Sequence, residues 1–234
     1  MSTVFLIYPK TKKMPTFQEL LDLSTKRLHE RFSELNIKAR PVINVYIHFK
    51  DPQKIIDRDL KTLSFGENIM SAYFYVDDIP HGTDAHFVTV SQYDWNDWME
   101  EDETDHTLEK ERTPLILSCL EIGHYWYFRR SINQPPIINL TYGLMSVSLA
   151  ELTNAYIYSG DGAWDTERFP ATVEEFDSWY FRPEMALELE FKEWATQCLK
   201  ALTTDIAYSD IIRPQEENNI VTELLQKLKE NGIT

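Results

Sequence analysis

Three acidic side chains stand close together after a short apolar run, and their types and spacing are the best suited in this chain to do chemistry. Asp161, Asp165 and Glu167 lie in the segment Ser159–Pro170, which also holds two glycines. Carboxylates at such spacing can act as general acid and base, or bind Ca²⁺ through their oxygens. The alternating acidic ligands and the Gly at the sixth position of an EF-hand loop are missing, so calcium is the weaker interpretation.

A turn that follows a strand explains the same segment without any chemistry. Its glycines would adopt positive φ, its carboxylates would accept hydrogen bonds from nearby backbone N–H groups, and Trp164 and Phe169 would pack against the core. A third interpretation is a contact surface for another protein, formed by Asp161, Trp164, Asp165 and Glu167. The sequence leaves these three interpretations open.

Motifs for metal, nucleotide or nucleophile chemistry are missing elsewhere. None of the six histidines forms a His-x-x-x-His or His-Glu-x-x-His pair, and the group His81, Asp84 and His86 matches no metal motif. The chain has no Gly-x-Ser-x-Gly elbow, and with only seven glycines it is poorly equipped to bring backbone N–H groups to a phosphate. We therefore predict a protein that is not an enzyme and uses no cofactor and no metal.

A dense run of carboxylates over residues 94–111 is the one clear break in composition. Nine acidic residues stand there against a single lysine, which is typical of a solvated face or an exposed insertion. Large apolar side chains at its start instead favour a contact surface for a basic partner. The predicted contact residues of this segment are Trp95, Asp97, Trp98, Glu100, Glu101, Asp102 and Glu103.

The charge balance of the chain favours basic partners over nucleic acid. Its 38 acidic and 23 basic residues give a net charge of −15, which repels phosphate, although such acidity also serves solubility alone. Cys119 and Cys198 lie in apolar stretches and are expected to be unpaired thiols in a reducing compartment. The first apolar run is too short for a signal peptide and no window is long enough to span a membrane, so we expect a cytoplasmic protein.

The apolar pattern predicts the elements that position these residues. We expect one α+β domain over residues 1–234, with a mixed β-sheet flanked by helices, a helix-rich C-terminal part and an acidic insertion at about 94–111. Strands are predicted at 4–8, 42–49, 69–76, 86–92, 115–122 and 155–158, and residues 124–128 are a further strand or the start of a buried helix. In the second of these strands Tyr46 and His48 alternate with apolar residues, so only one face should be buried.

Helix starts are marked by two capping boxes, Thr16 with Glu19 and Thr172 with Glu175. Further helices are expected from Asp51, over residues 147–152, from Pro183 and over residues 217–230. The helix from Pro183 is predicted to bury a stripe formed by Leu187, Phe191, Trp194, Cys198 and Leu202.

A family resemblance is carried by Ser159–Pro170 and by its continuation Glu174-Glu175-Phe176-Asp177-Ser178-Trp179-Tyr180-Phe181-Arg182-Pro183-Glu184. From about Leu144 to Glu184 the chain resembles the conserved core of bacterial immunity proteins of polymorphic toxin systems, in the family paired with restriction-endonuclease-like toxins. The resemblance implies a cytoplasmic inhibitor that binds a cognate toxin and blocks its active site or assembly, and it carries over no contact position. Opposite charge would then speed encounter with a nuclease that has a basic substrate groove.

Two other classes of function remain open beside the inhibitor. One is a small hydrolase or metal-dependent enzyme that uses Asp161, Asp165 and Glu167. The other is a structural subunit that associates with itself through an aromatic surface. The oligomeric state and the identity of the toxin are not fixed by the sequence.

Overall fold

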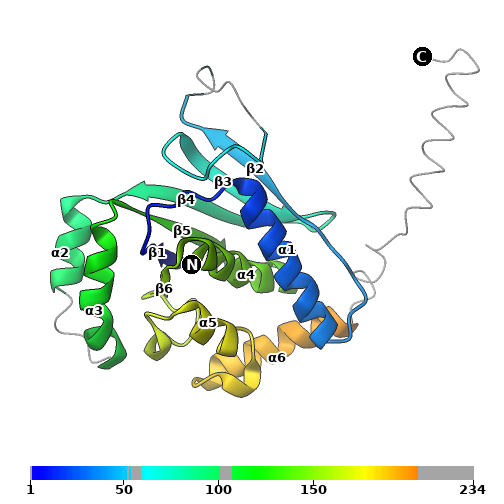
Figure 1. The fold of residues 1–234 in the computed structure, drawn as a ribbon. Coiled ribbons are helices and arrows are strands. Elements are labelled where there is room, and N and C mark those ends of the chain that lie inside the picture. Colours follow the sequence, from blue (N-terminus) through cyan, green and yellow to red (C-terminus); the bar gives the residue numbers. More distant parts are fainter. Residues whose placement is uncertain (1, 52, 54–58, 101–106, 205–234) are drawn as a thin grey trace, which may run out of the picture.

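The computed structural model describes residues 2–51, 53, 59–100 and 107–204, and its centre is a six-stranded sheet (Figure 1). The strand order is β2-β3-β4-β5-β1-β6, and every one of these pairings is antiparallel. The α+β class is confirmed, but the sheet is antiparallel where a mixed sheet was expected. The strands are β1 Ser2–Tyr8, β2 Ile43–Phe49, β3 Ile69–Val76, β4 Thr83–Thr89, β5 His124–Ser131 and β6 Tyr156–Tyr158.

Helices flank this sheet and dominate the C-terminal part of the described chain. The α-helices are α1 Phe17–Glu34, α2 Gln92–Glu100, α3 Thr107–Leu120, α4 Pro136–Thr153, α5 Val173–Trp179 and α6 Leu189–Thr204, with 3₁₀ turns η2 Thr166–Arg168 and η3 Pro183–Met185. Helix α4 packs against α1, against β1 and β5 of the sheet, and against α5 and α6. One hydrophobic cluster accordingly contains residues from β1 through to α6.

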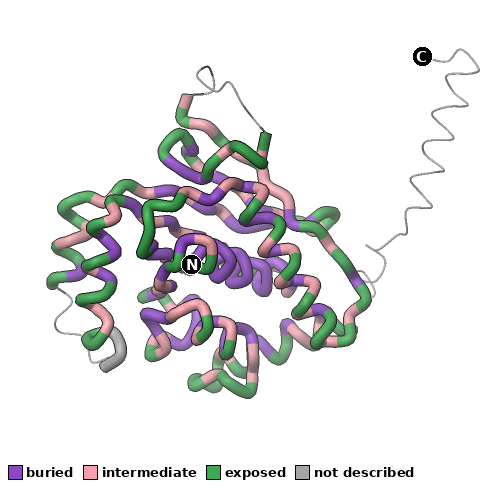
Figure 2. The backbone as a smooth tube through the Cα atoms, in the orientation of Figure 1, coloured by how far each residue is buried: buried purple, intermediate pink, exposed green. Residues whose placement is uncertain are grey.

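Helix α4 is the central element of this core, and Figure 2 shows it buried along most of its length. Three of its hydroxyl groups are satisfied within the helix, because Ser146, Ser148 and Thr153 each donate to the carbonyl oxygen four residues earlier, at 2.9, 2.6 and 2.7 Å. The helix begins at Pro136, the first helical position, where the missing N–H costs nothing. The sequence prediction of a short helix at 147–152 therefore captured only its second half.

Both predicted capping boxes are confirmed. The Thr16 hydroxyl accepts from the Glu19 backbone N–H at 3.2 Å, while the Glu19 carboxylate accepts from the Thr16 backbone N–H at 2.8 Å. Thr172 and Glu175 repeat the arrangement at the start of α5. These reciprocal bonds satisfy N–H groups that the first helical turn cannot pair internally.

Several predicted elements differ from the observed ones. Residues 115–122 were expected to form a strand, but most of them belong to α3, because a short, mostly apolar stretch does not distinguish a buried strand from a buried helix. The strand expected at 86–92 runs from Thr83 to Thr89, and Gln92 begins α2. Pro183 starts only a 3₁₀ turn, and Leu187 lies before α6 with 57% of its surface exposed. Most of the helix expected from Asp51 and all of 217–230 lie outside the described residues.

Strand alternation gives the sheet two different faces. The inner face carries Phe5, Ile7, Phe74, Trp126 and Phe128, all at most 1% exposed. This face packs against α1 and α4. Residues one position along each strand point to the opposite face, which has a very different environment.

Candidate partner-binding surface

Tyrosine and histidine side chains gather on the outer face of the sheet. Tyr46 of β2 pairs with Tyr73 of β3, which pairs with Asp84 of β4, and Asp84 in turn pairs with Arg129 of β5. We call the surface formed by Tyr46, His48, Tyr73, Asp84, His86, Tyr127 and Arg129 the open face. Its residues are exposed or half-buried, and Tyr46 reaches 61% exposure.

Side-chain contacts within and between strands hold the rings of the open face in place. The rings of His86 and Tyr127 stack with centroids 4.6 Å apart, and His48 meets Tyr46 edge to face at 4.8 Å. The Nη2 of Arg129 donates to the Asp84 carboxylate at 2.9 Å. Side chains that are ordered before binding lose little conformational entropy when a partner arrives.

Burial favours the uncharged form of three aromatic groups on the open face. Burial lowers the pKa of His86, which keeps its imidazole neutral at pH 7. Burial likewise raises the pKa of Tyr73 and Tyr127, so both phenols keep their protons. Uncharged aromatic groups with a polar edge are enriched in the central part of protein interfaces.

One end of the same sheet face is covered by the α2–α3 pair. Tyr125 lies two residues before Tyr127 and so on the same side of β5, where it packs beside Tyr8, Trp98 and Ile116 in a second hydrophobic cluster. Its hydroxyl donates to Asp94 at 2.9 Å, which ties the start of α2 to the sheet. The open face is the remaining part of this side, over β2 to β5.

The tryptophans of the acidic segment lie toward this second cluster. Trp98 is only 4% exposed, its Nε1–H donates to the Tyr8 hydroxyl at 3.0 Å, and its ring packs on Tyr158. The prediction that Trp98 is a partner contact is therefore wrong, because its ring fills the core beneath α2. Trp95 is half-buried and packs on the same cluster.

The solvent side of α2 is formed by other residues. Asp97 is exposed as predicted, and Met99 is 54% exposed. Tyr93, at 73% exposure, was not anticipated. The side chain of Glu100 and the whole of Glu101, Asp102 and Glu103 lie outside the described residues.

In the acidic group at 161–167, Asp165 and the neighbouring Trp164 have structural roles. Asp165 is 1% exposed and accepts hydrogen bonds from the backbone N–H groups of Leu187 and Glu188 at 2.9 and 3.0 Å. These bonds hold the segment that leads into α6. Trp164 is fully buried. The predictions of Asp165 and Trp164 as partner contacts are therefore wrong, whereas the packing predicted for Trp164 in a structural turn is confirmed.

The other two carboxylates of this group do not join Asp165 in a common site. Asp161 is exposed and accepts from the Val4 backbone N–H at 3.1 Å and from the Ser159 hydroxyl at 3.0 Å, so it braces β1. Glu167 is exposed on the η2 turn. No three His, Cys, Asp or Glu side chains of the described residues come together as metal ligands would.

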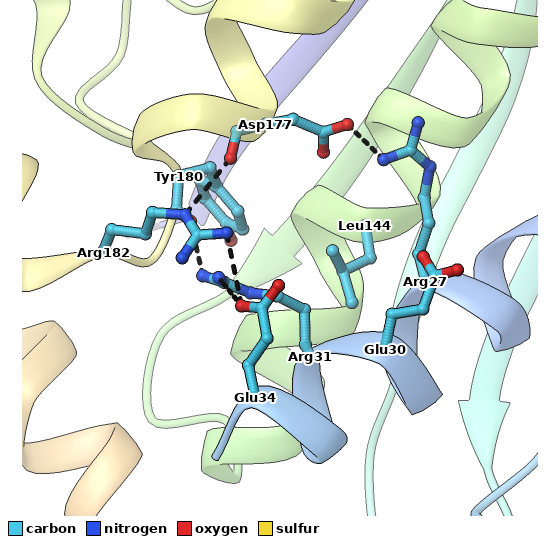
Figure 3. Close-up of a pocket in the computed structure, with 8 residues that line it drawn as sticks. All are labelled: Arg27, Glu30, Arg31, Glu34, Leu144, Asp177, Tyr180 and Arg182. Atoms are coloured by element: carbon cyan, nitrogen blue, oxygen red, sulfur yellow. Dashed lines mark hydrogen bonds and ion pairs between the residues drawn. The ribbon is translucent and has the colours of Figure 1, made fainter.

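A pocket of about 170 Å³ beside α1 and α5 is rich in charge (Figure 3). Arg31 donates from Nη1 to Glu34 at 2.7 Å and from Nη2 to the Tyr180 and Phe181 carbonyls, both at 3.1 Å. Burial, together with the nearby Arg182 guanidinium, lowers the pKa of Arg31.

The remaining arginines of this pocket are also paired within the protein. Arg27 bridges Asp177 and Glu151, and Arg182 reaches Glu34 at 3.3 Å. Each guanidinium therefore already has a carboxylate partner, as Figure 3 shows for Arg27, Arg31 and Arg182. These ion pairs join α1 to α4 and to the end of α5, so the charged groups of this pocket have a structural role.

Comparison of the chain with models of known protein families found no match, and comparisons with curated proteins and with solved structures found none either. Among the described helices, none combines the length and apolar character needed to cross a membrane. The function is therefore argued from the chain's own surfaces, of which the open face has the composition of a binding site.

Proposed function

We propose that this chain is a cytoplasmic immunity-type protein that binds a basic, nuclease-like protein toxin and inhibits it, with the open face at the centre of the contact. The observation that carries the proposal is the set of pre-ordered tyrosine and histidine rings left accessible on a strongly acidic protein. Tyrosine supplies a large contact area at a low cost in side-chain entropy, and it is enriched among residues that dominate binding energy.

The distribution of charge around the open face supports a basic occupant. Asp77 and Asp78 are exposed in the turn after β3, and Asp97 is exposed on α2, which follows β4. Because β3 and β4 are antiparallel, these carboxylates lie toward opposite ends of the strands that form the face. Acidic groups around an uncharged aromatic centre match the arrangement of a polar rim around an apolar interface core.

Flat aromatic surfaces on sheets also bind single-stranded nucleic acid, by stacking bases on the rings. The net charge of −15 opposes that alternative, since nucleic-acid sites rely on Lys and Arg to neutralise phosphates. Arg129 is the basic residue of the open face, and Asp84 already pairs with it. A protein with a positive surface is therefore the better occupant.

The proposal implies a simple mode of inhibition. A nuclease must present a basic groove to its substrate, and an acidic protein that docks there competes with the substrate for the same charges. The carboxylates at the rim would mainly accelerate encounter, whereas the rings would slow dissociation. Inhibition of this kind needs no catalytic residue on the inhibitor.

The experiment is co-expression with a candidate nuclease toxin taken from the genes that neighbour this one, followed by binding kinetics with the purified pair. Truncating Tyr46 and Tyr127 to Ala should abolish protection of the cells and cost about 2 kcal/mol or more of binding free energy, mostly through faster dissociation. Tyr93→Ala is the matched control, because Tyr93 is equally aromatic and 73% exposed but lies on α2. Full protection by the double variant, with its fold intact, would refute the proposal.

Light scattering distinguishes the inhibitor from a structural subunit that associates with itself through the same rings. A structural subunit would show a mass that rises with concentration and falls back to that of one chain in the double variant. The inhibitor is expected to stay unchanged in mass until the toxin is added.

A further inference from the structure

A second cavity lies where the end of β5 meets the start of α4 and one side of α6. Its volume is about 350 Å³, which is at the small end of the range for ligand sites. Arg130 and Asn139 form its polar wall, and Trp194 contributes an aromatic wall. The remaining lining comes from Ser131, Ile132, Asn133, Gln134 and Cys198.

The guanidinium of Arg130 is the unusual feature of this cavity. The residue is only 9% exposed, and its guanidinium lies between two aromatic rings, 4.8 Å from the Trp194 centroid and 5.2 Å from that of Tyr142. It donates from Nη1 to the Asn139 amide oxygen at 3.0 Å and from Nη2 to the Thr3 hydroxyl at 3.3 Å. Both partners are neutral.

Within the described part of the chain, the positive charge of Arg130 therefore has no counter-ion. No carboxylate of the described residues forms an ion pair with it, although acidic residues outnumber basic ones in this chain. The half-buried arginines Arg27, Arg31 and Arg112 behave differently, since each of them forms an ion pair with a carboxylate. A buried cation without an anion is costly, and an anionic ligand would offset that cost.

Other groups around the cavity are also suited to an anion. The N-terminus of α4, an 18-residue helix, adjoins it and has no side-chain cap, and helix N-termini attract negative charge. The Nε of Arg130 is buried without a hydrogen-bond partner in this structure, so one N–H of the guanidinium makes no hydrogen bond within the described residues. The site therefore has unused polar capacity beside its unpaired charge.

We propose that this cavity binds a small monocarboxylic acid, with the carboxylate on Arg130 and the apolar body of the molecule against Trp194. A planar guanidinium matches a carboxylate through parallel N–H donors. A single anionic charge is favoured because one cation is present and the net charge of the chain, −15, repels multiply charged ions such as phosphate. The inference is independent of the open face, which lies on the other side of the sheet.

Cys198 allows the site to be tested directly, because it lines the cavity, whereas Cys119 is buried in the second cluster beneath α2. The alkylation rate of each thiol is followed by mass spectrometry, with sodium benzoate as the probe and benzamide as its neutral isostere. Benzoate should slow the modification of Cys198 at least fivefold and leave Cys119 unchanged, while benzamide and sodium sulfate at equal ionic strength should slow neither.

Two substitutions at the mouth of the cavity provide a matched pair that should fold. Ile132 lines the cavity and is 57% exposed, so Ile132→Glu and Ile132→Gln differ in charge but barely in size. The Glu variant should lose most of the protection by benzoate, and the Gln variant should keep it. Equal protection by benzamide or sulfate, no protection by benzoate, or equal behaviour of the two variants would each overturn the proposal.

Discussion

Replacing Trp98 distinguishes a structural role of the acidic segment at 94–111 from a role in contacting a partner. Its indole is 4% exposed and donates to the Tyr8 hydroxyl, so replacing it by Ala removes both a packed ring and a buried hydrogen bond. Deleting a buried tryptophan costs about 3–5 kcal/mol, and the hydrogen bond contributes about 1 kcal/mol within that loss. Because the cluster lies at one end of the sheet and can partly relax, we expect about 3 kcal/mol for Trp98→Ala.

The assay is urea denaturation followed by circular dichroism. Trp98→Phe keeps most of the ring and should cost about 1 kcal/mol, chiefly through the lost hydrogen bond. Tyr93→Ala, on the exposed side of the same helix, should stay within about 0.5 kcal/mol of the wild type. If Trp98→Ala lowers the free energy of unfolding by less than about 1 kcal/mol and instead weakens toxin binding, the reasoning fails and the indole is a partner contact after all.

Two further predictions concern stability. The Arg112 guanidinium, at 2.6 Å, lowers the pKa of Glu175 from 4.5 to about 2, so this carboxylate stabilises the fold above pH 4.5 and loses that effect as the pH falls toward 2. The difference in unfolding free energy between wild type and Glu175→Gln should therefore shrink between pH 5 and pH 2.5, and a constant difference would contradict the pairing. A Cβ at Gly143 would lie 2.0 Å from Cε1 of the buried Tyr180 ring, so Gly143→Ala should destabilise the protein by about 3 kcal/mol. Calorimetry that shows an unchanged melting temperature would disprove this close packing.

The two capping boxes predicted helix starts correctly, whereas the starts of α4 and α6 and the type of the buried elements were predicted less well. Thr16 with Glu19 and Thr172 with Glu175 work through hydrogen bonds within one turn, and the sequence alone contains them. Residues 115–122 are mostly apolar, with Ser118 and Glu121 between the apolar residues, and contacts with Tyr8 and Trp98, distant in sequence, decide that most of this stretch is a helix.

The candidate site was not predicted from the sequence, because the expected contact residues lie at 95–103 and 161–167 and none of them belongs to the open face. The alternation of Tyr46 and His48 with apolar residues in β2 indicated an exposed face, but the partner strands that extend it were visible only in the sheet order. Trp98 and Asp165 were misassigned because exposure depends on what packs above a residue, and composition contains no such information. Which groups surround Arg130, and that no described carboxylate pairs with it, likewise depends on contacts between residues distant in sequence.

The central claim, that the open face holds a basic protein partner, is tested most directly by the dissociation rate of the purified toxin from the wild type, from the Tyr46→Ala, Tyr127→Ala double variant and from Tyr93→Ala. We predict that the double variant dissociates at least about thirtyfold faster, which corresponds to about 2 kcal/mol, and that the control is unchanged. Equal dissociation rates for all three proteins, with their folds intact, would contradict the claim.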